Sequence, residues 1–199
     1  MKVKRVFRAV CTGVVSTLLL ALCGFTGQCE DVSERVLRLH VIAASDSTQD
    51  QAIKLKVRDA ILAQTTGMLD GVLNTALAES MLREALPQIE EVAKKELLRN
   101  GVTDDVHVEL CDSYFSTREY ETFTLPAGEY RALRVIIGEG KGQNWWCVVF
   151  PPLCLSSVCE QGFSDVLTEE ETTIVTQRSR YEVRFKLVEW YEQLCGWFQ

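Results

Sequence analysis

Several residues and motifs that mark metal enzymes and hydrolases are scarce or absent in this sequence. It contains two histidines, His40 and His107, and no Cys-x-x-Cys pair. A structural zinc site, which takes four Cys or His ligands, is therefore not expected. The His-Glu-x-x-His and Gly-x-Ser-x-Gly signatures are also missing, as are internal repeats and low-complexity segments. We expect no metal site and no cofactor.

Acidic residues outnumber basic ones beyond the first residues of the chain. The formal net charge is -7, and residues 1–23 hold four cations and no acid, so the remainder carries -11. Nucleic acids and anionic membranes bind clustered Lys and Arg side chains. The acidic balance argues against both as the main partner.

The first 23 residues have the pattern of an export signal. Lys2, Lys4, Arg5 and Arg8 precede a largely apolar run over residues 9–25, as in a secretory signal peptide. The run is at the short edge of the about 20 apolar residues that span a bilayer. Small residues in Ala21-Leu22-Cys23 make cleavage after Cys23 one interpretation. An uncleaved anchor, with transient membrane association, is the other.

Residues 24–199 are predicted to form one domain with one hydrophobic core. Strand, helix and strand patterns follow one another along the first half, with a helix end at Asn100-Gly101. Ser47 is predicted to cap the first helix, with Asp50 in the position of a capping box. The expected elements are a strand at 36–43, helices at 48–64, 74–86 and 87–99, and a strand at 106–110.

Two β-branched and aromatic runs, 130–137 and 145–150, follow these elements. Their period-two alternation and the glycine-rich connection predict an antiparallel hairpin. The run 120–124 is predicted to pair beside the first strand, which completes a three-stranded meander. Helices followed by a meander indicate the α+β class.

The C-terminal part is predicted to be a solvated loop at 168–173 and an amphipathic helix at 181–198. Packing of the helix on the sheet is favoured over binding to a partner or a membrane. Its expected apolar stripe consists of Val183, Leu187, Trp190, Leu194 and Trp197.

The glycine-rich loop at 138–142 is a candidate functional site. Gly138, Gly140 and Gly142 resemble a phosphate loop only in composition, because they lead into a strand rather than a helix. A plain hairpin loop is one interpretation. The other is a recognition edge, since Trp145 and Trp146 must face opposite sides of the sheet, one in the core and one outside.

Six of the eight cysteines lie outside the leader. Cys147 and Cys154 are the expected disulfide pair, because the Phe150-Pro151-Pro152 segment between them ends the strand. An alternative function is an exported thiol hydrolase with Cys147 as nucleophile and His40 as base, supported by Asp46. No characteristic local sequence surrounds Cys147, which weakens this alternative.

Two segments resemble a known family. Residues 37–47 with 50–60, and residues 126–154, are similar to the two signature regions of the stage II sporulation protein R family. The second contains Pro126-Ala127-Gly128-Glu129-Tyr130 and Asn144-Trp145-Trp146-Cys147-Val148-Val149-Phe150-Pro151-Pro152. The resemblance covers nearly the whole chain.

The resemblance implies an activator rather than an enzyme. Members are secreted from the forespore into the space between the forespore and mother-cell membranes. There they activate a membrane-embedded aspartic protease that processes pro-sigma-E. The residues expected to contact this partner are Gly138, Gly140, Lys141, Gly142, Asn144, Trp145 and Trp146, with Asp46, Lys56, Arg58 and Asp59 as a second surface.

Overall fold

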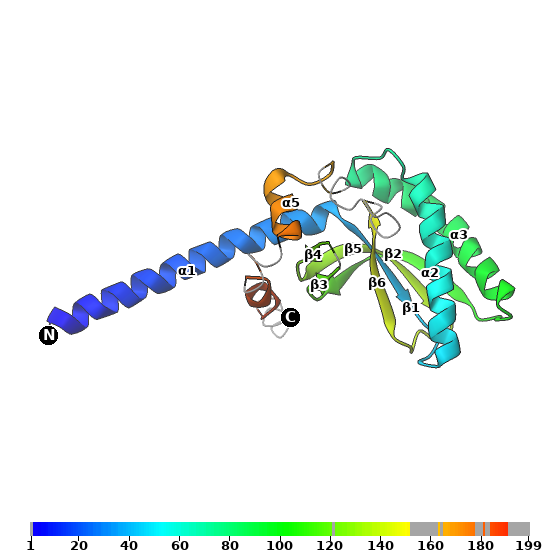
Figure 1. Cartoon of the computed structure of the whole chain (residues 1–199), viewed down its shortest axis with the longest axis horizontal. Helices are drawn as coiled ribbons and strands as arrows, with labels where there is room; N and C mark the ends of the chain where they lie inside the picture. Colours follow the sequence, from blue (N-terminus) through cyan, green and yellow to red (C-terminus); the bar gives the residue numbers. More distant parts are fainter. Residues whose placement is uncertain are drawn as a thin grey trace.

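A four-stranded sheet with helices on both faces organises the structure, a computed structural model (Figure 1). It describes residues 2–120, 122–151, 163, 165–177, 181 and 184–190. Residues 181 and 184–190 are also helical. The elements are α1 (Lys2–Arg35), β1 (Leu37–Ile42), α2 (Thr48–Met68), α3 (Thr75–Arg99), β2 (Val106–Phe115), β3 (Arg118–Glu119), β4 (Thr124–Leu125), β5 (Gly128–Ile137), β6 (Asn144–Phe150) and α5 (Glu169–Thr176).

The α+β class is confirmed, but the predicted order of neighbouring strands is wrong. The sheet order is β2-β5-β1-β6. β1 runs parallel to β5 and antiparallel to β6, so β5 and β6 are separated by β1 and do not form a hairpin. The predicted strand at 120–124 is also wrong, because β4 pairs with β3 in a separate two-stranded sheet.

Burial on both faces explains the central position of β1. Leu37, Leu39 and Val41 point into the main core, while Arg38 and His40 are buried on the opposite face. A strand that is covered on both sides and paired at both edges leaves no backbone group facing solvent. The alternation of apolar and polar residues in β1 did not predict its central position, because the polar residues Arg38 and His40 are buried too.

Helices α2 and α3 cover one face of the sheet (Figure 1). Ser47 caps α2 as predicted, accepting a hydrogen bond from the Asp50 backbone N–H at 3.0 Å. The Asp50 carboxylate, however, binds the Ser45 hydroxyl instead of completing a capping box. The α2 helix is longer than predicted and ends at Met68.

The two helices predicted at 74–86 and 87–99 are one helix, α3. Pro87 lies in its interior on the exposed side. The prediction placed Pro87 at a helix start, where its missing N–H costs nothing. The buried stripe instead continues across it, and this burial outweighs the lost hydrogen bond. The helix end at Asn100 and Gly101 is confirmed, with Gly101 at φ 75°. The stripe consists of Ala78, Leu82, Ala85, Ile89, Ala93 and Leu97.

The C-terminal half of α1, the β3–β4 ribbon and α5 cover the other face (Figure 1). The loop predicted at 168–173 is wrong, because α5 begins there. Thr168 accepts a hydrogen bond from the Glu171 N–H, and the Glu171 carboxylate accepts one from the Thr168 N–H. This capping box overrides the polar composition. Glu171 also pairs with Arg35 of α1 at 3.2 Å.

The predicted apolar stripe of the C-terminal helix is wrong where the structure describes it. Leu187 and Trp190 are 41% and 63% exposed, whereas Phe185 and Val188 are buried. Phe185 and Val188 pack with Phe25 of α1 and with α5 rather than on the sheet. Val183, Leu194 and Trp197 lie outside the described side chains.

The N-terminal half of α1 projects from the rest of the molecule (Figure 1). Each side chain described between residues 10 and 24 is exposed, and burial begins at Phe25. The helix runs without a break through Cys23, where cleavage is predicted. Within the part of the chain that the structure describes, no helix combines the length and hydropathy needed to cross a membrane.

Candidate protein-binding site

The loop from Gly138 to Gly142 is folded onto the end of β1. Gly138 and Gly140 have φ values of 56° and 62°, a left-handed region that favours glycine. Gly142 is required for a different reason. A Cβ atom there would lie 2.2 Å from the Ser45 carbonyl oxygen. The three glycines therefore allow the loop to lie directly against the segment that joins β1 to α2.

Backbone hydrogen bonds fix this contact. The Lys141 and Gly142 N–H groups donate to the carbonyls of Ala44 and Ala43, at 3.2 and 2.9 Å. The Asp46 carboxylate accepts a hydrogen bond from the Gln143 N–H at 2.7 Å. Asp46 thus holds the loop in place through its backbone, which gives this residue a structural role in addition to the predicted contact with a partner.

Lys54 is a further anchor of the loop that sequence analysis did not single out. It is only 4% exposed, and its ammonium donates to the Gln143 carbonyl at 2.9 Å and to the Gln51 side chain at 2.6 Å. Burial lowers the pKa of Lys54, while the Asp46 charge opposes this shift. The sequence did contain a signal for the burial of Lys54. It lies next to Ile53 and three residues before Val57, and helical spacing places these positions on one face of α2.

Trp145 is the exposed aromatic residue beside this loop. It is 36% exposed, and the Arg58 guanidinium lies 4.2 Å from its ring centroid. Arg58 also forms an ion pair with Asp59 at 2.6 Å. The cation–π contact holds both side chains in one arrangement and joins β6 to α2. We call Trp145, Arg58, Asp59 and the loop 138–144 the Trp145 platform.

Trp146 faces the opposite side of the sheet, as the prediction that one tryptophan is buried and the other outside requires. Its ring stacks on His40 at 3.9 Å and meets Phe115 edge-on at 4.6 Å. His40 is 7% exposed, and burial lowers its pKa from 6.5 to about 4. The Asn144 side chain opposes that shift, and the charges of Arg134 and Arg38 add to it. Trp146 is therefore part of the packed interior and not of the platform.

Arg38 lies deeper on that same face and is fully buried. Its guanidinium stacks 4.1 Å from the Phe115 centroid and 4.9 Å from that of Tyr130. It donates hydrogen bonds to the Cys147 carbonyl and to the Tyr120 hydroxyl. Aromatic faces and neutral acceptors therefore surround this cation, so its role is structural.

The two predicted contact surfaces merge into one, with one exception. Asp46, Arg58 and Asp59 lie against or within the platform through the contacts given above. Lys56 does not, since its ammonium binds the Asn100 side chain at the end of α3. At the loop tip, Lys141 and Glu139 form a solvent-exposed ion pair of 2.6 Å. The platform thus offers one aromatic ring framed by both signs of charge.

The residues of the alternative thiol hydrolase do not come together. Cys147 points into the core between the sheet and α2 and α3, while His40 is buried on the opposite face. Asp46 binds the loop backbone instead. A nucleophile and its base must lie within hydrogen-bonding distance. The sheet itself separates Cys147 from His40, so this arrangement is excluded. Cys154 lies outside the described residues, and its pairing with Cys147 stays a prediction.

No group of three or more His, Cys, Asp or Glu side chains suited to a metal occurs in the described ranges.

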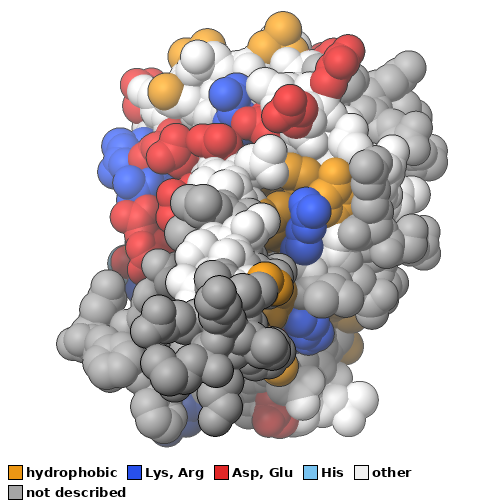
Figure 2. All heavy atoms as spheres, turned by 90° about the vertical axis from the view of Figure 1, so that its left-hand side faces the viewer, with side chains coloured by type: hydrophobic (Ala, Val, Ile, Leu, Met, Phe, Trp, Pro, Cys, Tyr) orange, Lys and Arg blue, Asp and Glu red, His pale blue; other side chains and the backbone are white. Residues whose placement is uncertain are grey.

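On the face seen from the N-terminal end of α1, acidic and basic side chains lie next to one another rather than in a field of one sign (Figure 2). The geometry at the platform suits recognition of a protein surface, in which aromatic and Arg side chains supply much of the binding energy.

Comparison with known proteins agrees with the sequence resemblance. The model of the family described as stage II sporulation protein R matches residues 33–160. Stage II sporulation protein R of Bacillus subtilis (strain 168) is 31% identical over 185 residues, which cover 82% of this chain and 83% of that protein. No solved structure matches the chain. The matched residues include the whole Trp145 platform.

Proposed function

Because the chain belongs to the stage II sporulation protein R family, we propose that it is an exported signal that activates a membrane-embedded aspartic protease. The forespore secretes it into the space between the forespore and mother-cell membranes. The activated protease then processes pro-sigma-E. In this function the protein is a binding partner, and the bond cleavage occurs on the protease.

The observation that supports docking is the Trp145 platform. A partly exposed tryptophan is held by Arg58, next to a loop already fixed by four hydrogen bonds. Three loop N–H groups donate to Ala43, Ala44 and Asp46, and the Lys54 ammonium donates to a loop carbonyl. Association costs less conformational entropy when the contact residues are ordered beforehand. Trp and Arg are also the residue types most enriched among binding hot spots.

Activation requires unequal binding to two states of the protease. A ligand shifts a conformational equilibrium only by the difference in its affinities for the two conformations. The platform must therefore bind the active arrangement of the extracellular face more tightly than the resting arrangement. A tenfold shift in the population of the active state requires a tenfold ratio of these affinities.

Export is supported by the leader and by its separation from the core. The basic and apolar pattern of residues 1–23 is that of a secretory signal. The side chains described between residues 10 and 24 make no buried contact, whereas Phe25, Cys29 and Val32 are buried. Removal of the projecting segment would leave the packed part of α1 in place.

The test is alanine substitution at Trp145 with Trp190 as the matched control. Trp190 is 63% exposed and belongs to the helical residues 184–190, whose buried side chains pack with α1 and α5. Trp145→Ala is expected to weaken binding of the full chain to the purified receptor protease by roughly 30-fold, the loss typical of a hot spot. Trp190→Ala is expected to bind normally. Processing of pro-sigma-E in sporulating cells should follow the same order.

Normal binding and processing by a folded Trp145→Ala variant would remove the platform as the docking site. Equal losses in both tryptophan variants would point to general destabilisation, and urea unfolding of each variant identifies that case. Retention of the wild-type protein in the cytosol of the cell that makes it would refute the exported signal itself.

The oxidising environment outside the cytoplasm also permits the predicted Cys147–Cys154 disulfide. Non-reducing peptide mapping of the secreted protein should recover these two cysteines in one linked fragment. Serine at Cys147 should then cost about 2–4 kcal/mol of unfolding free energy. Alkylation of both thiols without prior reduction would contradict this pairing.

A further inference from the structure

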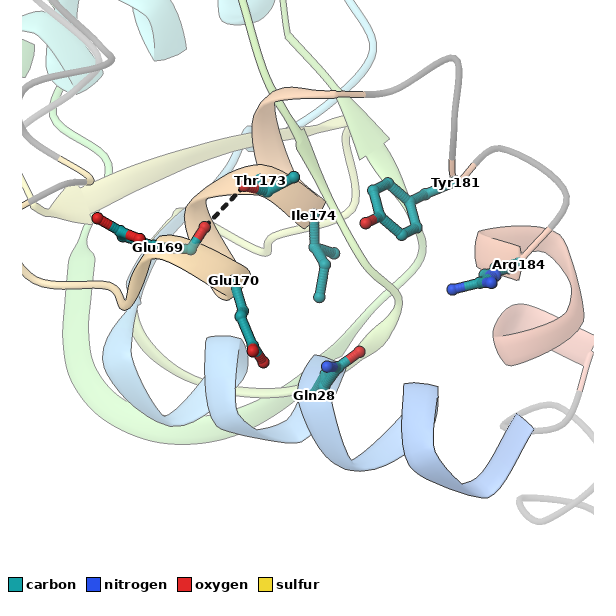
Figure 3. Close-up of a pocket in the computed structure, with 7 residues that line it drawn as sticks. All are labelled: Gln28, Glu169, Glu170, Thr173, Ile174, Tyr181 and Arg184. Atoms are coloured by element: carbon teal, nitrogen blue, oxygen red, sulfur yellow. Dashed lines mark hydrogen bonds between the residues drawn. The ribbon is translucent and has the colours of Figure 1, made fainter. Parts of the chain in front are cut away.

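A hollow of about 400 Å³ lies between α1, α5 and the C-terminal helical residues, and it is open to solvent (Figure 3). Gln28 contributes from α1, Glu170 and Ile174 from α5, and Tyr181 and Arg184 from the C-terminal segment. Small-molecule sites have volumes of about 300–1,000 Å³. The hollow lies across the sheet from the Trp145 platform, and neither the family match nor the docking function involves it.

Opposite charges stand at two sides of this hollow. Figure 3 shows the Arg184 guanidinium directed into the space bounded by Tyr181, Ile174 and Gln28, and the Glu170 side chain directed toward α1. No ion pair to Glu170 or to Arg184 occurs in the part of the chain that the structure describes. Both charged groups are therefore available to a ligand. The buried Ile174 and the Tyr181 ring form an apolar wall between them.

The cation is held in place by aromatic rings. The Arg184 guanidinium carbon lies 5.6 Å from the Phe25 centroid and 5.5 Å from the Tyr181 centroid. These two rings stack on each other at 5.8 Å, and Phe25 is buried. The aromatic pair limits the positions that the guanidinium can adopt.

The backbone on the acidic side of the hollow is fixed as well. The capping box of α5 defines where the first helical turn begins, and hence the backbone position from which the Glu170 side chain extends. The ion pair between Glu171 and Arg35 connects that turn to α1. The two charges therefore belong to elements that are tied to the same helix.

We propose that this hollow binds a short peptide with free amino and carboxyl ends. The ammonium group pairs with Glu170 and the carboxylate with Arg184, for which the planar guanidinium provides two parallel donors. An apolar side chain of the peptide covers Ile174 and the Tyr181 ring. Gln28 offers an amide donor and an acceptor to the peptide group. A ligand with only one of the two charges leaves one of these side chains unpaired.

The experiment is a titration of the full chain with the dipeptide Ala-Leu, followed by NMR of labelled protein. N-acetyl-Ala-Leu lacks the ammonium, and Ala-Leu amide lacks the carboxylate. Ala-Leu is expected to shift the resonances of Ile174 and Tyr181 in a saturable manner, and each blocked peptide to bind at least tenfold more weakly. Shifts of equal affinity for all three peptides, or no saturable shift with any of them, would overturn the proposal.

Paired variants assign each end of the peptide. Glu170→Gln should weaken binding of Ala-Leu at least tenfold but leave binding of N-acetyl-Ala-Leu unchanged. Arg184→Gln should likewise weaken binding of Ala-Leu at least tenfold but leave binding of Ala-Leu amide unchanged. Glu91→Gln and Arg83→Gln, two exposed positions on α3, are the matched controls and should bind like the wild type. Circular dichroism establishes that the variants are folded. Loss of binding in the control variants, or full binding in both site variants, would refute the assignment.

Discussion

Acid is expected to destabilise this protein through His40. Burial lowers the pKa of His40 to about 4, whereas the unfolded chain has the ordinary value of 6.5. Between these two values the unfolded state binds a proton that the folded state excludes. The free energy of unfolding therefore falls as the pH drops from about 6.5 to about 4, and the contribution is fully present above 6.5.

The size of this effect follows from the two pKa values. Between pH 7 and pH 5 the His40 linkage removes about 2 kcal/mol of stability. For a domain of this size, a urea m-value of about 2 kcal/mol per molar converts this loss into a midpoint shift of about 1 M. Carboxyl groups and other ionisable side chains add their own pH dependence, so the comparison must be made against a variant that lacks only this imidazole.

The assay is urea unfolding at pH 5, 6, 7 and 8, followed by tryptophan fluorescence. His40→Phe keeps an aromatic ring against Trp146 and cannot titrate, so its midpoint should change by about 1 M less than that of the wild type across this range. His107→Gln is the control, because the His107 side chain is 67% exposed. It should follow the wild-type curve.

Parallel pH curves for the wild type and His40→Phe would refute the reasoning. If the larger ring disturbs packing, His40→Leu provides a second non-titrating side chain, and the pH slope rather than the absolute stability is compared. A steeper slope in either His40 variant would also contradict the direction worked out above.

Four further substitutions test the loop and the helices by urea unfolding. Gly142→Ala should destabilise the protein by about 1–3 kcal/mol, because its Cβ would lie 2.2 Å from Ser45. Gly67→Ala, in α2 with no atom within 4 Å of the new Cβ, should instead stabilise it by about 0.5–1 kcal/mol, and the same sign for both would contradict the proposed close approach. Pro87→Ala should stabilise α3 by about 1–3 kcal/mol, since the N–H that bonds the preceding turn is restored, and a loss of stability would contradict the expected cost of a proline inside this helix. Thr168→Ala should cost about 1 kcal/mol through the lost cap of α5, and an unchanged midpoint would mean that α5 is stabilised by packing alone.

Local sequence patterns predicted most elements but not how they assemble. Alternation identified the strands β1, β2, β5 and β6, and Ser47 marked the start of α2. The pairing of strands depends on which strand can tolerate burial on both faces. In β1 this depends on Arg38, which is buried against Phe115 and Tyr130. The sequence alone does not distinguish such a buried cation from one that faces water, so the central position of β1 was not predicted.

The candidate site was predicted only in part, because local patterns identify residues but not how the elements that carry them pack. The glycines, Trp145 and Arg58 were each identifiable by type, and adjacent tryptophans must face opposite sides of a strand. That Arg58 stacks on Trp145 depends on α2 crossing β6, which no local pattern encodes. Lys56, only two residues away along α2, points toward α3 instead.

The insertion of β1 between β5 and β6 determines when the Trp145 platform can form. Arg58 and Trp145 are 87 positions apart in the sequence, and they meet only after the first strand has entered the sheet beside the last. If the protein is exported as proposed, a chain that is still in the translocation channel carries every platform residue but has not yet formed the Trp145 platform. In the proposed function, only molecules that have completed both transport and folding could then bind the protease.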